Sequence, residues 1–305
     1  MSKLLKEQRI VDPVLTQLAR GYSNAEMIAH RLFPFVTVGK EAGKVPQFGK
    51  EAFKLYNSKR AIRARSNRVV PEGIATIPFE TEEHDLEYPI DYREKNEAMF
   101  SQENQARKVT QNGIFLIHEK DCADLAQDDS NYDAANKVTL SGTDQWTDYS
   151  NSDPVGDVEA GKAAVRAKIG REPNLMVMGY SVYNKLKLHT KLLEKIKYSM
   201  KEILTLELLQ EIFGISMVVG KSIYSTDAGA FVDLWKDNVI LAWVPTAAKT
   251  YDEPSYGYTL RLKGHPWVDK YVENGGKIEL IRSTDNFVPK MVGAEAGFLI
   301  KDTNA

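Results

Sequence analysis

Ser181 is the residue of this sequence best placed to act as a nucleophile. It stands in the segment Gly179-Tyr180-Ser181-Val182-Tyr183, between a predicted strand and a predicted helix. Serine hydrolases hold their attacking hydroxyl on such a turn, which requires a glycine where Tyr183 stands. A role as the N-cap of the following helix explains Ser181 with fewer requirements. A serine hydrolase that uses Ser181 therefore stays only as an alternative function.

The other residues with chemical potential do not show the spacing of a known site. The five histidines lack the H-E-x-x-H pattern with which a helix binds zinc. Residues 39–44 look like a phosphate-binding loop, but the segment is one residue short and Val45 follows in place of Ser or Thr. The acidic residues 128–131 lack the glycine and the final glutamate of a calcium loop. We predict no catalytic residue, no cofactor and no metal site.

The composition excludes several classes of protein. The chain has 305 residues, of which 40 are basic and 42 acidic, so its formal net charge is −2. This balance argues against a protein whose main task is to coat nucleic acid. The single cysteine, Cys122, excludes an intrachain disulfide and is expected to be a packing residue. No stretch predicts a membrane-spanning helix or a signal peptide.

The charged side chains between residues 39 and 97 are segregated by sign. Residues 39–70 hold nine basic and two acidic residues, whereas residues 71–97 hold two basic and nine acidic ones. The cores of these two runs are Lys59, Arg60, Arg63, Arg65 and Arg68, then Glu80, Glu82, Glu83, Asp85 and Glu87.

The two runs allow three interpretations. They could neutralise each other within one solvated hairpin. A nucleic-acid-binding hairpin is disfavoured, because its acidic strand would repel phosphate. We favour a projecting arm whose charges meet complementary charges on other copies of the chain, which makes these ten residues proposed inter-subunit contacts.

Short helices and a long hairpin are predicted around these charges. A first helix would run from Asp12 to Gly21, and a capping box of Ser23 and Glu26 predicts a second helix that ends before Pro34. These helices are too short to stand alone, so they must pack on this chain or on a neighbouring one. The hairpin strands are expected at residues 45–48, 61–70, 74–82 and 86–92, with the tip at residues 71–73.

The rest of the chain predicts an α+β fold. Apolar residues recur at helical spacing over residues 97–126, which predicts one long helix, and a polar linker pinned by Trp146 and Tyr149 follows. Further helices are expected at residues 157–169, 181–188 and 206–213, and strands at 175–178, 215–219, 239–244, 258–262 and 277–282. A hairpin of residues 287–292 and 297–301 would end the chain. The strands are segregated and do not form repeating βαβ units.

The order of these elements resembles the major capsid protein of tailed bacteriophages, with the Hong Kong ninety-seven-type fold. Local resemblances support it in Val11-Asp12-Pro13-Val14-Leu15-Thr16 with Leu32-Phe33-Pro34, Leu140-Ser141-Gly142 with Trp146 and Asp153-Pro154, Pro173 to Gly179 with Lys185-Leu186 and His189, and Gly293 to Ile300. The resemblance implies an N-terminal arm (1–38), an extended loop (39–95), a spine helix of the peripheral domain (96–126), an axial domain (127–275) and a C-terminal hairpin (276–305) that completes the peripheral domain.

The resemblance also implies a role in a virion. The chain would be a structural protein and not an enzyme, forming pentamers and hexamers that build an icosahedral shell around double-stranded DNA bound without sequence specificity. Because the chain has no room for a scaffolding segment before the arm, a separate scaffolding protein is implied, together with a portal protein. A decoration protein is left open, and no crosslink between subunits and no membrane are expected. Assembly would take place in the host cytoplasm. The alternative within the structural class is an encapsulin-like bacterial compartment.

Overall fold

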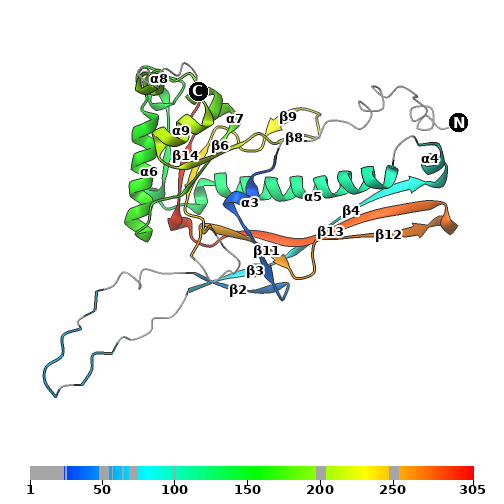
Figure 1. The fold of residues 1–305 in the computed structure, drawn as a ribbon, viewed down its shortest axis with the longest axis horizontal. Helices are drawn as coiled ribbons and strands as arrows, with labels where there is room; N and C mark the ends of the chain where they lie inside the picture. Colours follow the sequence, from blue (N-terminus) through cyan, green and yellow to red (C-terminus); the bar gives the residue numbers. More distant parts are fainter. Residues whose placement is uncertain are drawn as a thin grey trace.

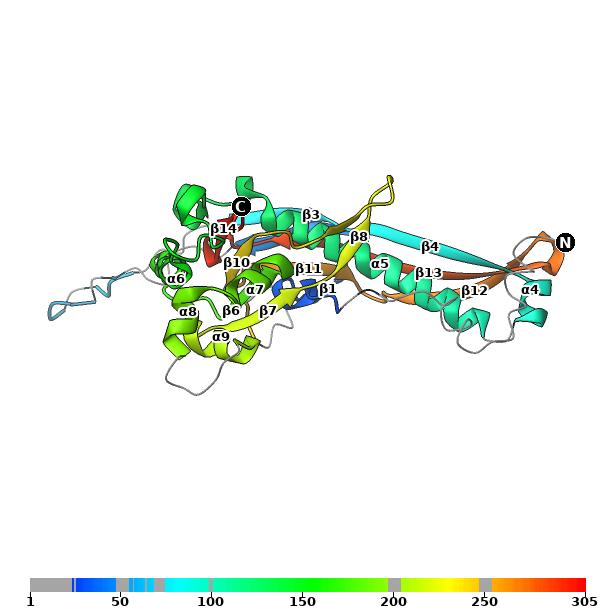
Figure 2. The ribbon, with the colours of Figure 1, turned by 90° about the horizontal axis from the view of Figure 1, so that it is seen from above.

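The described part of the protein is elongated and contains two five-stranded β-sheets (Figures 1 and 2). The computed structural model describes residues 24, 26–47, 55–56, 58–63, 65–68, 75–98, 101–196, 204–246 and 254–305. The first predicted helix, at residues 12–21, and the expected hairpin tip at residues 71–73 lie outside these residues.

The first sheet extends along the molecule beside a long helix. Its strands are β1 (Phe35–Val38), β11 (Gly257–Leu262), β13 (Ile278–Met291) and β12 (Trp267–Glu273), in that order, and β4 (Glu82–Asp91) also pairs with β13. The helix, α5 (Gln102–Gln127), begins at Ser101, whose side chain accepts a hydrogen bond from the Asn104 amide. Its 26 residues span about 39 Å at the rise of an α-helix.

The second sheet forms a more globular part at one end of the molecule. Its strand order is β5 (Lys137–Thr139), β14 (Gly297–Lys301), β10 (Val239–Ala242), β6 (Leu175–Gly179) and β7 (Ser216–Gly220). The helices of this part are α6 (Pro154–Ile169), α7 (Tyr180–Leu186), α8 (Thr190–Ile196) and α9 (Leu206–Phe213). Thr205 caps α9 and Gly214 ends it with a positive φ, as the sequence predicts.

Two small hairpins and several short helical turns complete the described chain. The hairpins are β2 (Ala42–Gln47) with β3 (Ala75–Glu80), and β8 (Ile223–Ser225) with β9 (Phe231–Asp233). The short elements are α3 (Ala29–Leu32), α4 (Tyr92–Glu97), and the 3-10 turns η2 (Asp129–Asn131), η3 (Ala134–Asn136), η4 (Gly142–Asp144), η5 (Asn274–Gly276) and η6 (Ala294–Ala296).

Several sequence-based expectations are wrong in detail. The long helix does not begin at residue 97, because the backbone is extended at Ala98 and Ser101 and separates α4 from α5. The described residues of the expected strand 61–70 contain no strand. The C-terminal hairpin is not formed either. Residues 287–291 end β13 in the first sheet, whereas β14 pairs with β10 and β5 in the second.

The expected packing residues are buried. Cys122 and Trp146 are both fully buried, and Trp146 donates from its indole nitrogen to Asp157, 2.8 Å away. Tyr149 packs edge-on against His189. These contacts fix the polar segment that follows α5, so it is an ordered edge of the second sheet.

His118 lies where α5 crosses the first sheet. Its ring stacks on Phe35 of β1, meets Phe287 of β13 edge-on, and its Nε2 lies 2.8 Å from Thr259 Oγ1 on β11. Because Thr259 Oγ1 donates to the Phe33 carbonyl, it accepts from His118 Nε2. Burial, assisted by the positive charge of Arg261 and by His30 and His84, lowers the pKa of His118 to about 3. The crossing is therefore built around a neutral imidazole.

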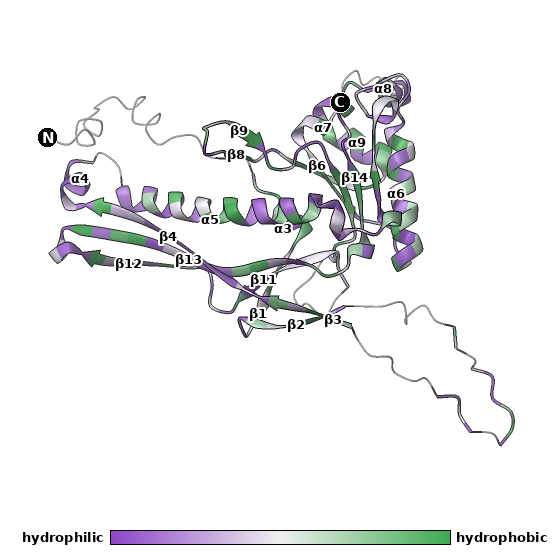
Figure 3. Cartoon of the chain, turned by 180° about the vertical axis from the view of Figure 1, so that it is seen from behind, coloured by the Kyte–Doolittle hydropathy of each residue, from purple (hydrophilic) through white to green (hydrophobic). Residues whose placement is uncertain are grey.

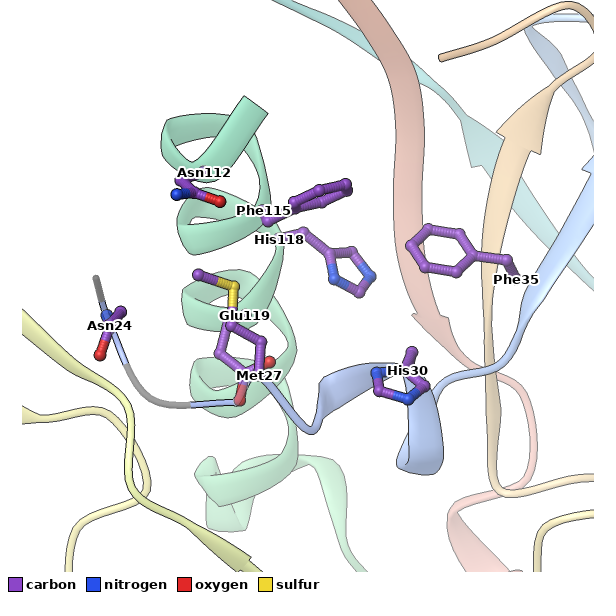
Figure 4. Close-up of a pocket in the computed structure, with 8 residues that line it drawn as sticks. All are labelled: Asn24, Met27, His30, Phe35, Asn112, Phe115, His118 and Glu119. Atoms are coloured by element: carbon purple, nitrogen blue, oxygen red, sulfur yellow. The ribbon is translucent and has the colours of Figure 1, made fainter. Parts of the chain in front are cut away.

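Beside this crossing, Glu119 joins α5 to two other segments of the chain. Its buried carboxylate accepts the Ile28 amide on Oε1 at 3.0 Å and the Ala29 amide on Oε2 at 2.8 Å. The Trp235 indole and the Ser222 hydroxyl also donate to Oε1, at 2.7 and 3.3 Å. Figure 4 shows Glu119 under Met27, at the edge of a pocket of about 350 Å³ between α5 and the segment before β1.

Glu119 explains why the second predicted helix is so short. The capping box of Ser23 and Glu26 would start a helix near residue 24, but α3 begins at Ala29. The first free amides of α3 are bonded by a carboxylate from another helix, so they need no local cap. Ile28 and Leu32 are buried, as expected from the sequence.

We expect acidification to destabilise the folded chain through His118. The unfolded chain protonates this imidazole below about pH 6.5, whereas the folded chain does so only near pH 3, so stability falls as the pH falls between these values. Between pH 6.5 and 5 the loss is about 2 kcal/mol. Denaturant titrations at each pH should show a correspondingly smaller loss for His118→Gln than for the wild type. Equal losses would contradict the assignment.

Replacing Glu119 should weaken the subunit strongly. Glu119→Ala leaves four buried donors without their acceptor, and each unpaired donor costs about 1–3 kcal/mol, so we expect a loss of at least about 3 kcal/mol in the free energy of unfolding. Glu119→Gln should lose less, because one carbonyl oxygen remains. As the matched control on the same helix, Glu103→Ala should cost at most about 1 kcal/mol, since Glu103 bonds only to exposed lysines. Similar losses for both alanine variants would refute this role.

Candidate inter-subunit interface

The basic run lies at the far end of the extended loop. The antiparallel register of β2 and β3 pairs Gln47 with Ala75, so the midpoint of the loop between them is residue 61. The basic residues Lys59, Arg60, Arg63, Arg65 and Arg68 surround this midpoint, and all five are exposed. Figure 1 shows the described loop segments (blue) well away from both sheets.

Apolar side chains accompany the basic run. Leu55 is 99% exposed and Ile62 is 93% exposed. A residue of this size contributes about 1.5–3 kcal/mol when it is buried, so its full exposure on a projecting loop is a feature of surfaces that bind a partner. The end of the loop therefore combines positive charge with uncovered apolar groups.

The acidic run lies elsewhere, because the hairpin is shorter than the sequence predicts. Glu80 ends β3, while Glu82, Glu83, Asp85 and Glu87 belong to β4, which pairs with β13 along its whole length. The strand pairing therefore does not place the two runs against each other within one chain. The hypothesis of a hairpin whose arms neutralise each other is wrong.

Strand alternation divides the acidic residues of β4 between two faces. Leu86 packs against Gly113, and Ile90 packs with Ala106 of α5, so the even-numbered residues of β4 face the helix. Glu82 belongs to that face. Glu83, Asp85 and Glu87 point away from α5.

Strand β12 extends this outward face with residues that the sequence analysis did not select. On β13, Ser283 bonds to Thr110 of α5, so the neighbouring residues Arg282 and Thr284 face outward, and their partners Asp269 and Trp267 share that face. We give the name acidic-aromatic face to these outward charged and aromatic residues: Glu83, Asp85, Glu87, Trp267, Asp269, Tyr271, Glu273 and Arg282.

Arg282 organises the centre of the acidic-aromatic face. Its guanidinium binds Asp269 at 2.6 Å and lies 5.3 Å from the ring centres of both Trp267 and Tyr271. The hydrogen bond to Asp269 raises the pKa of Arg282, and a hydrogen bond to Glu87 raises the pKa of Tyr271 to about 12. Arg282 therefore stays positively charged and Tyr271 stays neutral over the whole physiological range. Figure 3 shows hydrophilic and hydrophobic residues alternating along this ribbon of strands.

Ser181 is not the N-cap that the sequence suggested. Gly179 is the N-cap of α7, and Ser181 is the second residue of the helix, where its hydroxyl donates to the Lys236 carbonyl at 3.2 Å. A side chain at position 179 would collide with the same carbonyl, since its Cβ would lie 1.7 Å away. The glycine before this helix is thus explained by close backbone packing.

Within the described part of the chain, no group of His, Cys, Asp and Glu side chains is arranged to hold a metal ion. No described helix is long and apolar enough to cross a membrane.

The sequence analysis missed strand β12, which contributes to the acidic-aromatic face. The signal that could have identified it was the alternation in Trp267-Val268-Asp269-Lys270-Tyr271-Val272-Glu273, which is typical of a strand.

Comparison with known proteins agrees with the fold. The chain is 53% identical over 305 residues to the major capsid protein of Burkholderia phage BcepMu, covering 98% of this chain and 99% of the relative. A crystal structure of a phage-related protein from Bordetella bronchiseptica is 35% identical, with a TM-score of 0.77 over 97% of this chain and 98% of that one.

A more distant structure shows the fold alone. The capsid of cyanophage P-SCSP1u is 10% identical but superposes with a TM-score of 0.59, covering 92% of this chain and 89% of that chain. The α+β fold is thus that of phage capsid proteins. Residues 96–273, which include α5, four of the five strands of the second sheet and β11 and β12 of the first, match the family described as phage major capsid protein E. The chain belongs to the phage major capsid protein E family.

Proposed function

We propose that the chain is the repeating subunit of an icosahedral phage shell that encloses double-stranded DNA. The observation that carries this proposal is the placement of two complementary surfaces at opposite ends of one subunit. The basic loop projects at one end, and the acidic-aromatic face lies towards the other (Figure 1). The 53% identity to a phage major capsid protein supports the same role.

Such a subunit would form pentamers and hexamers by contacts that are individually weak. An exposed ion pair contributes about 0–1 kcal/mol. Each copy in a shell both gives and receives a loop, so the contacts act together and their effective concentration is high. The ten charged residues from Lys59 to Glu87 selected from the sequence are proposed as inter-subunit contacts on this basis.

The proposed partners follow from the shell. They are other copies of the chain, a scaffolding protein, a portal protein and packaged DNA bound without sequence preference, whereas a decoration protein is left open. The mature protein would reside in the virion after assembly in the host cytoplasm. The role is structural, with no reaction assigned to any residue.

Two alternatives have distinct tests. An encapsulin-like compartment would use the same fold and should co-purify with a cargo enzyme. It is less well supported, because the 53% identical relative is a phage protein. A serine hydrolase would label at Ser181 with a fluorophosphonate probe, and the absence of labelling would end that hypothesis.

Electron microscopy of the purified chain tests the proposal directly. We expect shells, tubes or rings of five or six subunits, with or without added scaffolding protein. A protein that stays a stable monomer at high concentration would overturn the proposed function.

Deletion of residues 1–23 should separate folding from assembly. The arm residues Ile28, Leu32 and Phe33 are buried in the subunit's own core, and β1 pairs with β11. The deletion therefore stops before these residues, so that the subunit core stays complete. We expect the shortened chain to keep its circular dichroism spectrum and to assemble poorly, because we propose that the predicted helix at residues 12–21 packs on a neighbour and not on its own subunit. The longer deletion of residues 1–33 is the control and should unfold the chain. If the short deletion assembles normally, residues 1–23 do not contribute to assembly.

A further inference from the structure

Phe231 is the most exposed aromatic side chain in the described part of the chain, at 75%. It belongs to β9, whose hairpin with β8 lies on the side of α5 away from the first sheet (Figure 1). Along β9, Phe231 and its neighbour Val232 point to opposite faces of the hairpin. Val232 pairs with Tyr224, and Lys120 Nζ of α5 lies 5.9 Å from the centre of the Tyr224 ring. The Phe231 ring therefore points away from its own helix.

Hydrogen bonds order the turn that joins β8 to β9. The Thr226 amide donates to the Ala230 carbonyl at 2.8 Å, and the Gly229 amide donates to the Thr226 carbonyl at 2.8 Å. The Thr226 hydroxyl also accepts a hydrogen bond from the Ala230 amide, at 3.2 Å. The end of the hairpin is thus a defined projection, with Phe231 on its outward face and the exposed Asp227 in its turn.

The pocket beside Glu119, which we call the α5 pocket, suits an aromatic side chain. Its volume of about 350 Å³ lies within the range of small ligand sites, and Met27, Phe35 and Phe115 supply apolar walls (Figure 4). Phe115 is 39% exposed, so this wall is open to a partner. Aromatic rings and methionine sulfur both attract a further aromatic ring. His118, which is neutral, adds an uncharged ring to the lining.

Asn24 fixes the hairpin relative to the α5 pocket. Its side chain lines the pocket, donates to the Ile223 carbonyl at 2.7 Å and accepts from the Ile223 amide at 3.2 Å. Ser222 and Trp235, which flank the hairpin, both donate to Glu119, another lining residue. These bonds hold the projection and the pocket in one arrangement on every copy. Because the exposed ring points away from α5, it cannot fill the pocket of its own chain, whereas the ring of a second copy can.

The charges around the two features are opposite. Lys108 is exposed one helical turn before Asn112, which lines the α5 pocket. Arg31 is exposed next to His30, another lining residue. The hairpin carries Asp227 in its turn, and residues 222–232 contain no basic side chain. The hairpin of a second copy therefore matches the pocket both in charge and in apolar character.

We propose that the α5 pocket is the docking site for Phe231 of a second copy of this chain. Asp227 of the same hairpin pairs with Lys108 of the receiving copy. The contact is reciprocal, so that two copies related by a two-fold axis each insert a ring into the pocket of the other. One side chain per copy is too small a contact to hold a dimer alone, so it acts between copies that other contacts bring together. The inference therefore rests on the proposed function.

Disulfide crosslinking tests the contact directly, because the natural Cys122 is fully buried. Phe231→Cys and Phe115→Cys are prepared as separate full-length chains with different isotope labels, mixed, assembled and oxidised. We expect mass spectrometry to find the peptide with position 231 of one chain joined to the peptide with position 115 of the other.

The matched control replaces Phe115→Cys by Tyr180→Cys. Tyr180 of α7 is also an exposed aromatic residue, at 43%, but it lies outside the α5 pocket. The control mixture should give roughly tenfold less crosslinked product, because its cysteines are not held together. Equal yields from the two mixtures would show that the crosslink reports random collision.

Removal of the ring tests whether the contact contributes to assembly. Phe231→Ser should leave circular dichroism and thermal unfolding unchanged, because the side chain is 75% exposed. We expect it to lower the assembled fraction in sedimentation roughly tenfold, since the lost contact is repeated across the particle. Leu188→Ser removes another exposed apolar side chain, at 62%, and should assemble like the wild type.

Charge reversal tests the pairing of Asp227 with Lys108. Asp227→Lys and Lys108→Glu each place like charges together, so each should assemble less well, and higher salt should reduce the loss. In a mixture of the two variants, a reciprocal contact between one and the other pairs opposite charges at both sites. The mixture should therefore assemble better than either variant alone, and normal assembly of both single variants contradicts the pairing.

The outcomes separate this inference from the proposed function. If the wild type forms shells but the 231–115 crosslink is no more frequent than the control, the docking site is wrong and the shell function stands. The same result is expected if residues 1–23 of the same chain fill the pocket. A chain with both cysteines that forms its disulfide internally, with no product in the mixture, also overturns the inference. A wild type that stays monomeric overturns both.

Discussion

The buried carboxylate of Glu119 is the interaction on which the geometry of the subunit depends. Four donors from three segments converge on it: two amides at the start of α3, the Ser222 hydroxyl and the Trp235 indole. Removing a charge from water is costly unless hydrogen bonds replace the lost solvation, and here they come from two backbone amides, an indole and a hydroxyl. The position of α5 relative to the segment before β1 and to residues 222 and 235 is set at this point.

Two long elements, α5 and β13, extend from this point along the molecule. α5 and β13 lie side by side, joined by Thr110 with Ser283 and by the aromatic packing of His118 with Phe287. β13 pairs with β11 near one end and with β12 near the other. The outward face of the ribbon is therefore rigidly related to the base of the loop. That relation matters for the proposed function, in which each copy would use both surfaces.

Much of the fold could be predicted from sequence patterns. Helical spacing located α5, and local caps located α9 between Thr205 and Gly214, because these signals act within a few residues. Long-range pairing could not be predicted. Nothing in residues 86–92 shows that β4 joins β13 and leaves the hairpin, and nothing near Glu119 shows that it caps a helix about 90 positions away in sequence.

Only part of the candidate interface could be predicted, because local patterns do not report long-range strand pairing. The two charged runs are visible as composition, so their residues could be selected without a structure. Which carboxylates share a face depends on strand parity and on where α5 packs. Glu82 and Glu83 are equivalent in sequence but lie on opposite sides of the sheet. Asp269 and Trp267 join the face through β13, about 180 residues from β4 along the chain, and local patterns do not report such pairs.

The place of β14 has a consequence for the timing of synthesis. Residues 297–301 form an inner strand of the second sheet, between β10 and β5. This sheet cannot close until those residues have left the ribosome, after every other described strand has been made. Until then β10 presents an unpaired edge, which is prone to pair with other chains. The second sheet is therefore completed only after the first, although β5, β6, β7 and β10 are made before β13.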